Sequence, residues 1–209
     1  MRIVIAGARE TGHAGVVLNV LKLTGEHKVG GFLDDNLIGK AVKGIPVIGG
    51  TEKLPDLSGF EGAFVAIGDN ETRMQIAKNL KSKGLKLVNV VHPSAIIADD
   101  VKIGKGIFIG AGSIINNGSK IGDNVIVNTN VTIDHDNTIE EGVHLAPGVN
   151  TAGRVTLKKG AFLGVGVKVI PDITIGEFAI IGAGAVVINN IPGNTTSVGV
   201  PAKPIKENK

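Results

Sequence analysis

A six-residue period of aliphatic side chains runs without a break through the second half of the sequence. From Ile97 to Val187, sixteen positions follow this period, and fifteen of them hold Ile, Leu or Val, with Thr151 as the exception. Such a hexad is typical of a parallel β-helix, in which three short strands form each coil and the stacked coils bury one continuous core. Three hexads make a coil of eighteen residues, so the series predicts a little over five coils.

The chain before about Pro93 is organised differently, with strand-like and helix-like segments in alternation. The expected strands are residues 2–8, 28–35, 62–68 and 85–91, and the expected helices are 16–23 and 70–84, the latter ending at Gly84. Apolar strands separated by helices indicate a parallel sheet that is covered on both faces. We therefore predict an α/β domain with a Rossmann-like parallel sheet over residues 1–93, and a β-helix domain with a C-terminal tail over 94–209.

Composition narrows the partners and the compartment. The 209 residues include no cysteine, which excludes disulfides and thiolate metal sites and suits a reducing cytoplasm. A net charge of +3 and an aromatic content of 3% argue against nucleic acid as a partner. Residues 178–202 carry no charge but contain Asn and Pro within the hexad period, so we expect no membrane span. The N-terminus lacks the long apolar stretch of a signal peptide, and we expect a cytoplasmic protein.

A histidine between two aspartates, in the stretch VTIDHDNTI, stands out from the repeat. Stacking by eighteen residues places His135 over Asn117 in one neighbouring coil and over Gly153 in the other, roughly 4.8 Å away at strand spacing. Acyl transfer needs a base for the attacking amine or hydroxyl, and an N–H donor for the thioester oxygen as it becomes an oxyanion. We expect neutral His135 to be the base, with Asp134 or Asp136 fixing its tautomer. The alternative is a solvated corner histidine.

A second histidine, His144, follows nine residues later, which is half a coil. Two residues half a coil apart cannot share a corner of one triangular prism. If both histidines serve one site, they must therefore come from different subunits packed side by side. A solvated exterior position is the alternative for His144.

The glycine-rich turn near the N-terminus is a candidate phosphate site. Gly7, Gly12 and Gly15 do not form G-x-G-x-x-G, so a dinucleotide and a redox role are poorly supported. A glycine turn that opens a helix still offers N–H groups to a phosphate, and His13 stands beside it. At the end of the second expected strand, Asp34 and Asp35 are placed to accept hydrogen bonds from a nucleotide base or ribose. The alternatives are a structural histidine and a solvated strand end.

Several motifs, in order along nearly the whole chain, support a resemblance: GARETGHAG, FLDD, VAIGDNETR, VHPSAII, IVNTNVTIDHD, HLAPGVNTAG and GVPAKPIK. They resemble those of the sialic acid O-acetyltransferase and UDP-4-amino-sugar N-acetyltransferase family of hexapeptide-repeat enzymes. The resemblance implies a left-handed β-helix, an exception to the usual right-handed crossover. It also implies acetyl-coenzyme A as co-substrate, a nucleotide sugar as substrate, a homotrimer with active sites between subunits, and a role in polysaccharide biosynthesis.

The same resemblance assigns residues to roles. It favours Asp136 as the partner of His135, the Gly153 amide as the oxyanion donor, and His144 of a neighbouring subunit as a contact of the acetyl or pantetheine part. The further coenzyme contacts that it implies are Asn128, Val165, Gly166 and Ala183. It adds Gly68 and Asp69 to the nucleotide-sugar contacts, which with the glycine turn and the strand end become Gly12, His13, Asp34, Asp35, Gly68 and Asp69.

The sequence departs from the family pattern at two places. The family turn is a compact Gly-Ala-small-Gly-His, whereas Arg9, Glu10 and Thr11 lengthen it here. The resemblance is therefore less close at the N-terminal ligand contacts than in the β-helix. The acidic residue after the catalytic histidine is often Glu in the family, and here it is the shorter Asp136.

We expect an acetyl-coenzyme A dependent N-acetyltransferase of a nucleotide-linked amino sugar, most simply a 4-amino sugar. O-acetylation of a sialic-acid-like sugar is the alternative within the class, because no residue decides between amine and hydroxyl. A non-catalytic nucleotide-sugar-binding protein is a second alternative, against which the Asp-His-Asp cluster argues. A zinc hydratase needs three histidines for each metal, and the β-helix holds only His135 and His144, so we expect no metal.

Overall fold

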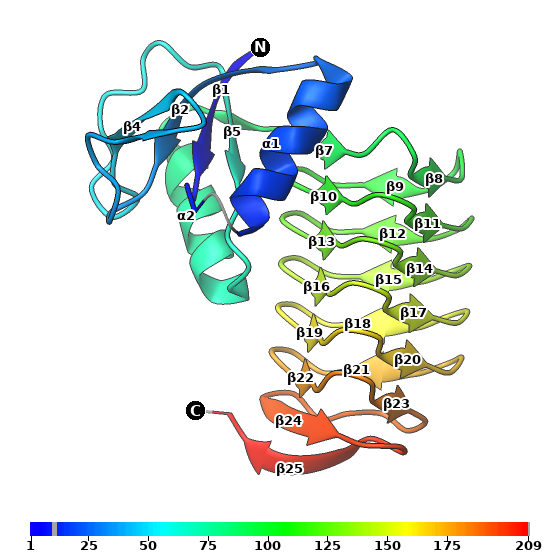
Figure 1. The fold of residues 1–209 in the computed structure, drawn as a ribbon. Helices are drawn as coiled ribbons and strands as arrows, with labels where there is room; N and C mark the ends of the chain where they lie inside the picture. The colour runs from blue at the N-terminus through cyan, green and yellow to red at the C-terminus, as the bar shows by residue number, and fades with distance from the viewer. Residues whose placement is uncertain (10–11, 209) are drawn as a thin grey trace. The chain divides into compact units, whose positions relative to one another are not determined.

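The computed structural model describes residues 1–9 and 12–208 of the chain. These divide into two compact units, Met1–Pro93 and Ser94–Lys209. Figure 1 shows two helices around a sheet in the first unit and a stack of short strands in the second. The expectation about the lengthened turn concerns Glu10 and Thr11, which lie outside the described residues.

The first unit is built on a six-stranded sheet in the order β3-β4-β2-β1-β5-β6. All neighbouring strands are parallel except the antiparallel pair β3 and β4. Val4, Ala6 and Val65 pack with Ile76 and Leu80 of the second helix in one apolar cluster. The strands are β1 (Arg2–Ala6), β2 (Lys28–Leu33), β3 (Ala41–Val42), β4 (Ile45–Gly49), β5 (Gly62–Val65) and β6 (Lys86–Leu87).

Two helices flank this sheet, α1 (His13–Thr24) and α2 (Asn70–Ser82) (Figure 1). Helix α1 follows Gly12, which caps it without a side-chain hydrogen bond, and α1 has no acidic residue in its first turn. Helix α2 has the opposite kind of start, because the side chain of Asp69 accepts a hydrogen bond from the Thr72 N–H. Gly84, just beyond α2, adopts a left-handed conformation with φ of 82°, in keeping with its predicted role as a stop.

The first unit differs in detail from the sequence expectation. Helix α1 begins at His13, three residues earlier than expected. The hairpin of β3 and β4 was not anticipated, because β3 is only two residues long and β4 contains Pro46. The last expected strand is divided into β6, which joins the sheet, and β7 (Val90–Val91), which does not.

The second unit is a parallel β-helix with three faces, and we name them by their strands. The first face contains β10 (Phe108–Ile109), β13 (Ile126–Val127), β16 (His144–Leu145), β19 (Phe162–Leu163) and β22 (Ile180–Ile181). The second contains β8 (Ile96–Ile97), β11 (Ile114–Ile115), β14 (Thr132–Ile133), β17 (Asn150–Thr151), β20 (Lys168–Val169) and β23 (Val186–Val187). The third contains β9 (Lys102–Ile103), β12 (Lys120–Ile121), β15 (Thr138–Ile139), β18 (Thr156–Leu157) and β21 (Thr174–Ile175).

Every pairing within these faces joins residues eighteen positions apart, as in Ile115↔Ile133↔Thr151. The predicted coil length is therefore confirmed. At the C-terminal end, β24 (Thr195–Val198) extends the first face and pairs antiparallel with β25 (Lys203–Glu207). The second residue of each two-residue strand points inward. From β10 onward these residues are buried and, apart from Thr151, aliphatic, and they form the core of the β-helix.

The three corners between the faces carry the outward-facing residues that matter for function. We call the turns between first and second face the first corner, and the turns between second and third face the second corner. Residues 128–131 lie at the first corner and 134–137 at the second corner of the same coil. Turns of the same corner stack on one another at eighteen-residue intervals, so each corner is a column of residues along the helix.

Candidate active site

His135 lies at the second corner, immediately after β14. Its Nδ1 is 2.9 Å from Oδ2 of Asp136, and the two side chains are 40% and 57% exposed. Because a carboxylate only accepts, this contact assigns the proton of neutral imidazole to Nδ1 and leaves the lone pair on Nε2. The geometry thus presents a half-exposed base with its tautomer fixed.

The two aspartates beside His135 have different partners. Oδ1 of Asp134 accepts hydrogen bonds from the His135 backbone N–H and from Nδ2 of Asn116, both at 2.9 Å. The hydrogen bond from Asn116, followed by that from His135, lowers the pKa of Asp134 below its usual value. Asp134 therefore shapes the turn, while Asp136 contacts the imidazole.

Gly153 lies against the imidazole from the next coil. A Cβ atom on Gly153 would lie 2.5 Å from both Nε2 and Cε1 of His135, so only glycine accepts the ring in this position. The Arg154 N–H donates to the His135 carbonyl at 3.0 Å, which ties the two coils together. Gly153 is buried, and within the described part of the chain its N–H donates no hydrogen bond.

Arg154 continues the column of Asp136 by one coil. Its guanidinium forms two hydrogen bonds with Asp172, at 2.6 and 2.9 Å. Asp172, and to a smaller extent Asp136, raise the pKa of Arg154, and Arg154 lowers the pKa of Asp172. The guanidinium of Arg154 therefore pairs with Asp172 of the following coil, while the carboxylate of Asp136 contacts His135.

His144 belongs to the first face. It stacks in register between Ile126 and Phe162, and its ring meets the Phe162 ring edge-on at a centroid distance of 5.2 Å. His144 and His135, which are half a coil apart in sequence, therefore lie on different sides of the β-helix.

The four other residues expected to contact coenzyme A share the first corner. Asn128 follows β13, Val165 and Gly166 follow β19, and Ala183 follows β22. Val165 is 56% exposed, and no atom lies within 4 Å of a Cβ built on Gly166. Oδ1 of Asn128 accepts from the Thr129 N–H at 2.8 Å. A corner of small and exposed residues leaves backbone groups accessible, which fits an extended pantetheine arm with its two amides.

The expected catalytic group and the expected coenzyme contacts therefore occupy separate columns. His135, Asp136 and Gly153 lie together at the second corner, while the residues from Asn128 to Ala183 line the first corner, and His144 lies on the first face beside it. One chain by itself does not bring these two groups together at one corner.

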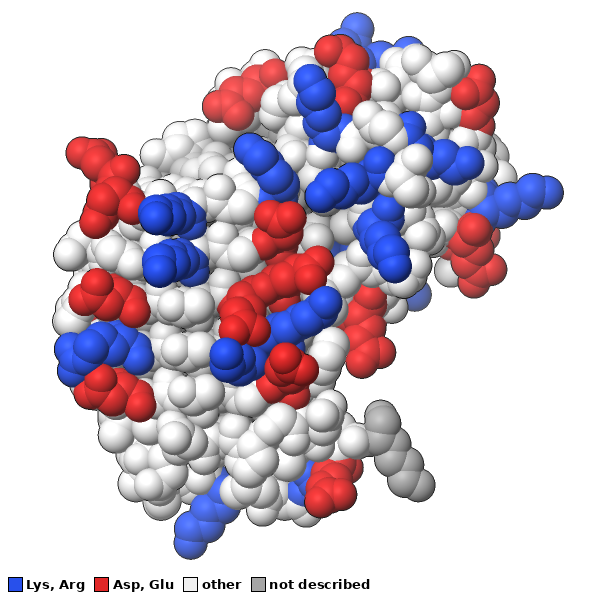
Figure 2. Space-filling model, turned by 180° about the vertical axis from the view of Figure 1, so that it is seen from behind, with Lys and Arg blue, Asp and Glu red and all other residues white. Residues whose placement is uncertain are grey.

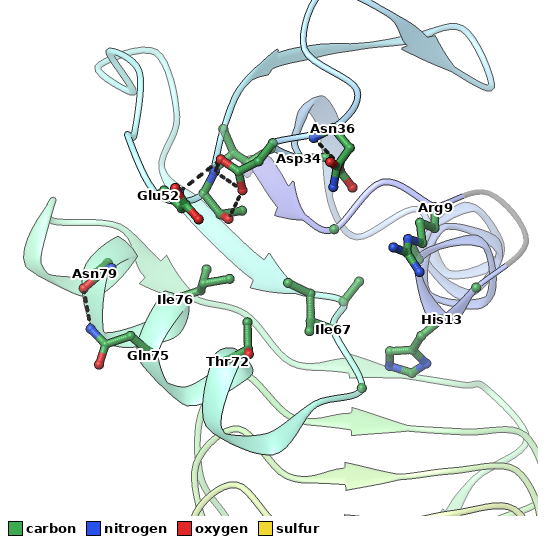
Figure 3. Close-up of a pocket in the computed structure, with 18 of the residues that line it drawn as sticks. Arg9, His13, Asp34, Asn36, Glu52, Ile67, Thr72, Gln75, Ile76 and Asn79 are labelled. Carbon is green, nitrogen blue, oxygen red and sulfur yellow. Dashed lines mark hydrogen bonds between the residues drawn. The ribbon is translucent and has the colours of Figure 1, made fainter.

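A second candidate site is a cavity of about 880 Å³ in the first unit. It opens beyond the carboxyl ends of β1, β2 and β5, where ligands of parallel sheets bind. The sequence-predicted residues Gly12, His13, Asp34, Asp35 and Gly68 all line it. In Figure 3, Arg9 and His13 lie on one side, whereas Asp34, Asn36 and Glu52 lie on another. Arg9 gives the cavity a basic wall, and Asp34 with Glu52 gives it an acidic wall.

The two aspartates at the end of β2 organise the acidic wall. Oδ2 of Asp34 accepts from the Ala8 N–H at 3.0 Å, which fixes the turn after β1. Asp35 accepts from the Thr51 hydroxyl and from the Thr51 and Glu52 N–H groups, and these bonds, the hydroxyl first, lower its pKa. Both carboxylates therefore accept hydrogen bonds that hold them in fixed positions.

Asp69 does not line the cavity, unlike the other expected nucleotide-sugar contacts. It caps α2, and the hydrogen bonds from Thr72 lower its pKa. Its neighbour along α2, Arg73, is fully buried and donates to the carbonyls of Ile67 and Gly68 at 3.1 and 3.0 Å. Burial lowers the pKa of Arg73 to about 10, so this guanidinium remains charged at neutral pH beneath the cavity.

His13 is held in its neutral form at the start of α1. Burial, and to a smaller extent the charge of Arg73, lower its pKa to about 4. At pH 7 it offers the cavity an uncharged imidazole. On this wall Arg9 supplies the positive charge, and the start of α1, which has no side-chain cap, adds the positive end of the helix dipole.

Sequence reasoning missed part of the cavity lining. Asn36, Thr51 and Glu52 come from the loops after β2 and β4, and Gln75 and Asn79 come from the exposed side of α2. Nothing in the loop sequence marks the first three. The pair on α2 has a signal, since Gln75 and Asn79 are four residues apart on a helix and hydrogen-bond at 3.0 Å.

Other features of the described chain concern metals, membranes and charge. Among the described residues, no group of three or more His, Cys, Asp and Glu side chains is arranged to hold a metal ion. No helix in the part of the chain that the structure describes combines the length and apolar character needed to cross a membrane. Figure 2 shows acidic and basic side chains interspersed over the face that it displays.

Comparisons with known proteins add relatives for both units. Residues 2–80 match the family model described as the PglD N-terminal domain. Perosamine N-acetyltransferase from Caulobacter crescentus, solved with CoA and GDP-perosamine, is 41% identical, with a TM-score of 0.93 over 99% of this chain and 98% of that one. The same enzyme was also solved with a histidine replaced by asparagine or alanine. No curated protein sequence matches the chain.

Two further structures are similar over almost their whole length. The acetyltransferase domain of PglB from Neisseria gonorrhoeae, in complex with acetyl coenzyme A, is 36% identical with a TM-score of 0.91, covering 98% of each chain. WeeI from Acinetobacter baumannii is 26% identical with a TM-score of 0.87, covering 98% of this chain and 100% of that one. The chain therefore belongs to the family of hexapeptide-repeat sugar acetyltransferases built on a left-handed β-helix.

Proposed function

We propose that the chain is an acetyl-coenzyme A dependent N-acetyltransferase that acylates the amino group of a nucleotide-linked amino sugar. The observation that carries this is the second corner, where Asp136 orients His135 and the ring lies against Gly153. A base and an N–H donor on adjacent coils are the two groups that acyl transfer from a thioester requires. The similarity to an N-acetyltransferase solved with CoA and GDP-perosamine favours nitrogen over oxygen as the acceptor.

His135 acts as general base in this reaction. Nε2 takes the proton as the sugar amine attacks the thioester carbonyl, and Asp136 stabilises the imidazolium that forms. The Gly153 N–H donates to the carbonyl oxygen as it becomes an oxyanion. When the C–S bond breaks, the imidazolium returns its proton to the departing sulfur, so His135 ends the cycle neutral and the amide is complete.

The nucleotide part of the substrate binds in the cavity of the first unit. The uncapped start of α1, with Arg9 beside it, suits the diphosphate. The carboxylates of Asp34, Asp35 and Glu52 suit the N–H groups of a base and the ribose hydroxyls. A cavity with one basic and one acidic wall thus matches the two ends of a nucleoside diphosphate, and the sugar extends from the basic end.

Acetyl-coenzyme A binds along the first corner, with His144 as a further contact. Because this corner and His135 lie on separate columns of one prism, a complete site needs the first corner of one chain beside the second corner of another. A homotrimer supplies three such sites by symmetry. We further propose that the enzyme works in the cytoplasm on precursors of a polysaccharide.

The test is a panel of GDP-, UDP- and dTDP-linked amino sugars, each assayed for release of coenzyme A thiol. The chain contains no cysteine, so a thiol reagent detects only the product. We expect release with at least one 4-amino sugar nucleotide, starting with GDP-perosamine. An amide product survives mild alkali, whereas the ester of an O-acetyltransferase is hydrolysed. Coenzyme A release with none of the amino sugars, or an alkali-labile product, would contradict the proposal.

A further inference from the structure

We infer that Asn137 is a positioning residue that couples the catalytic base to the oxyanion donor. Its side chain lies inside the β-helix, and Nδ2 donates to the carbonyls of Asp134 and Ala152 at 2.8 Å and to that of His135 at 3.2 Å. One amide group therefore joins the turn that carries His135 to the next coil. The inference rests on the proposed function of the second corner.

The location of Asn137 is unusual for a polar residue. It is fully buried, in an interior column that continues as Val155 and Ile173 in the following coils. Oδ1 of Asn137 is buried and has no hydrogen-bond partner among the described residues. A buried polar atom without a partner costs about 1–3 kcal/mol, and the next two residues of this column are aliphatic. The polar side chain is therefore better explained by what its donors hold in place.

The hydrogen bond to Ala152 is the contact with a consequence for catalysis. The Ala152 carbonyl belongs to the same peptide unit as the Gly153 N–H, the group assigned to the developing oxyanion. Because a peptide unit is planar, fixing the direction of its carbonyl also fixes the direction of its N–H. Donation to the carbonyl also polarises the unit and strengthens the N–H as a donor.

The hydrogen bonds to Asp134 and His135 act on the base from the same side chain. They hold both carbonyls of the turn toward the interior, and Ser119 supports them by donating to the Asp134 carbonyl at 2.9 Å. The Ser119 hydroxyl in turn accepts from the Asn137 N–H at 3.2 Å. The side-chain amide of Asn137 thus holds both the turn that carries the base and the peptide unit of the oxyanion donor. Its two hydrogen bonds of 2.8 Å, to the carbonyls of Asp134 and Ala152, set the distance between them.

Asn137→Leu tests this role, because leucine nearly matches asparagine in shape and suits an aliphatic column. We expect kcat to fall by about tenfold to a hundredfold, with KM for both substrates changed by less than about threefold, since misplacement affects the transition state more than binding. Asn137→Val, which copies the residue of the next coil, serves as the second variant if the first folds poorly. The matched control is Val155→Ala, which removes packing from the same column without touching these hydrogen bonds and should keep wild-type kcat.

A double-mutant cycle separates positioning from general damage. In a His135→Ala background the loss caused by Asn137→Leu should become smaller without vanishing, because the base that it helps to align is gone while the Gly153 N–H that it also orients remains. Equal losses in both backgrounds, or wild-type kcat in folded Asn137→Leu and Asn137→Val proteins, would overturn the inference. These outcomes need an active wild-type enzyme, so inactivity of the wild type would count against the proposed function instead.

Discussion

His135 is constrained on two sides, by the carboxylate of Asp136 and by Gly153 of the next coil. Asp136 fixes the proton on Nδ1, and Gly153 leaves room for the ring beside its own N–H. Asp136 itself adopts a left-handed conformation with φ of 57°, which Asp tolerates better than most residues. The pair is thus held by the geometry of the turn as well as by its hydrogen bond.

Replacing His135 should remove the base. We expect His135→Ala to lower kcat by on the order of 10²- to 10⁴-fold with coenzyme A binding nearly unchanged, measured by thiol release and by calorimetric titration. Asp136→Asn should cost less, because the imidazole remains and loses only its orienting carboxylate. Retention of more than about a tenth of wild-type kcat by His135→Ala would exclude it as the base.

Gly153→Ala tests the close approach of the ring. The new methyl group would lie closer to the imidazole than real side chains come to one another. The ring must therefore turn away, which breaks the contact between Nδ1 and Asp136. We expect kcat to fall by about a hundredfold, with a smaller effect on the melting temperature. Gly153 does not have a positive φ, whereas a glycine such as Gly166 does, so the expected loss comes from the contact with the ring and not from backbone strain. Wild-type kcat in a folded Gly153→Ala protein would contradict this account of the ring.

Some residue roles were predictable from sequence and others required coordinates. Stacking by eighteen predicted that His135 and Gly153 would be adjacent, because no insertion shifts the register between them. Spacing could not choose between Asp134 and Asp136, since both flank the histidine and only the turn geometry directs one carboxylate to Nδ1. Asn137 carried a signal that was overlooked, namely a polar residue at an interior position of the hexad.

At the scale of elements, the coils were predictable and the edge of the α/β sheet was not. A coil repeats the same local pattern, so sixteen weak signals reinforce one another. The β3–β4 hairpin depends on pairing with β2, a non-local contact that its short strands do not announce. The same limitation hid Thr51 and Glu52, whose N–H groups reach Asp35 from the loop after β4.

His13, the first residue of α1, should make the free energy of unfolding of the first unit depend on pH. The pKa of His13 is lowered from 6.5 to about 4 in the folded state, so between these values the unfolded chain binds the extra proton. The contribution of neutral His13 to the free energy of unfolding is therefore fully present above about pH 6.5. It decreases as the pH falls toward 4, by up to roughly 3 kcal/mol. The measurement is thermal unfolding at a series of pH values for wild type and His13→Gln.

We expect the variant to lose less stability than wild type between pH 6.5 and 4. Carboxylates with lowered pKa, such as Asp35 and Asp69, lose their contribution mainly below this window and are common to both proteins. Parallel curves for wild type and variant across this interval would show that His13 does not titrate as described.

Arg73 links α2 to the strand-end loop that borders the cavity. Arg73→Lys keeps a charge but loses the planar fork that reaches the Ile67 and Gly68 carbonyls together. We expect KM for the nucleotide sugar to rise by about tenfold while KM for acetyl-coenzyme A stays the same, as steady-state kinetics can separate. The control is Lys78→Arg, a substitution at an exposed position of α2, which should change neither KM value. A rise in both KM values would contradict a role of Arg73 that is confined to the nucleotide-sugar cavity.

At the scale of the whole molecule, the proposed functional groups are distributed over two units and over two corners of the β-helix. The first unit carries the cavity that we propose for the nucleotide, and the second carries the proposed base and the corner proposed for coenzyme A. The family resemblance predicts a trimer, and the coenzyme contacts that the same resemblance implies lie on a separate column of one chain from His135. The requirement for a neighbouring chain is therefore the central claim.

Complementation between inactive chains tests this claim most directly. One chain carries His135→Ala, and the other carries Ala183→Trp, which blocks the first corner at an exposed position; His144→Ala provides a second version of that partner. After the two folded, separately inactive proteins are dissociated and reassembled at equal amounts, about a quarter of the sites in a cyclic trimer should combine intact parts. We predict recovery of thiol release toward that fraction of wild-type activity. No recovery in verified mixed trimers would place the base and the coenzyme contacts of each site in one chain, and would contradict the claim.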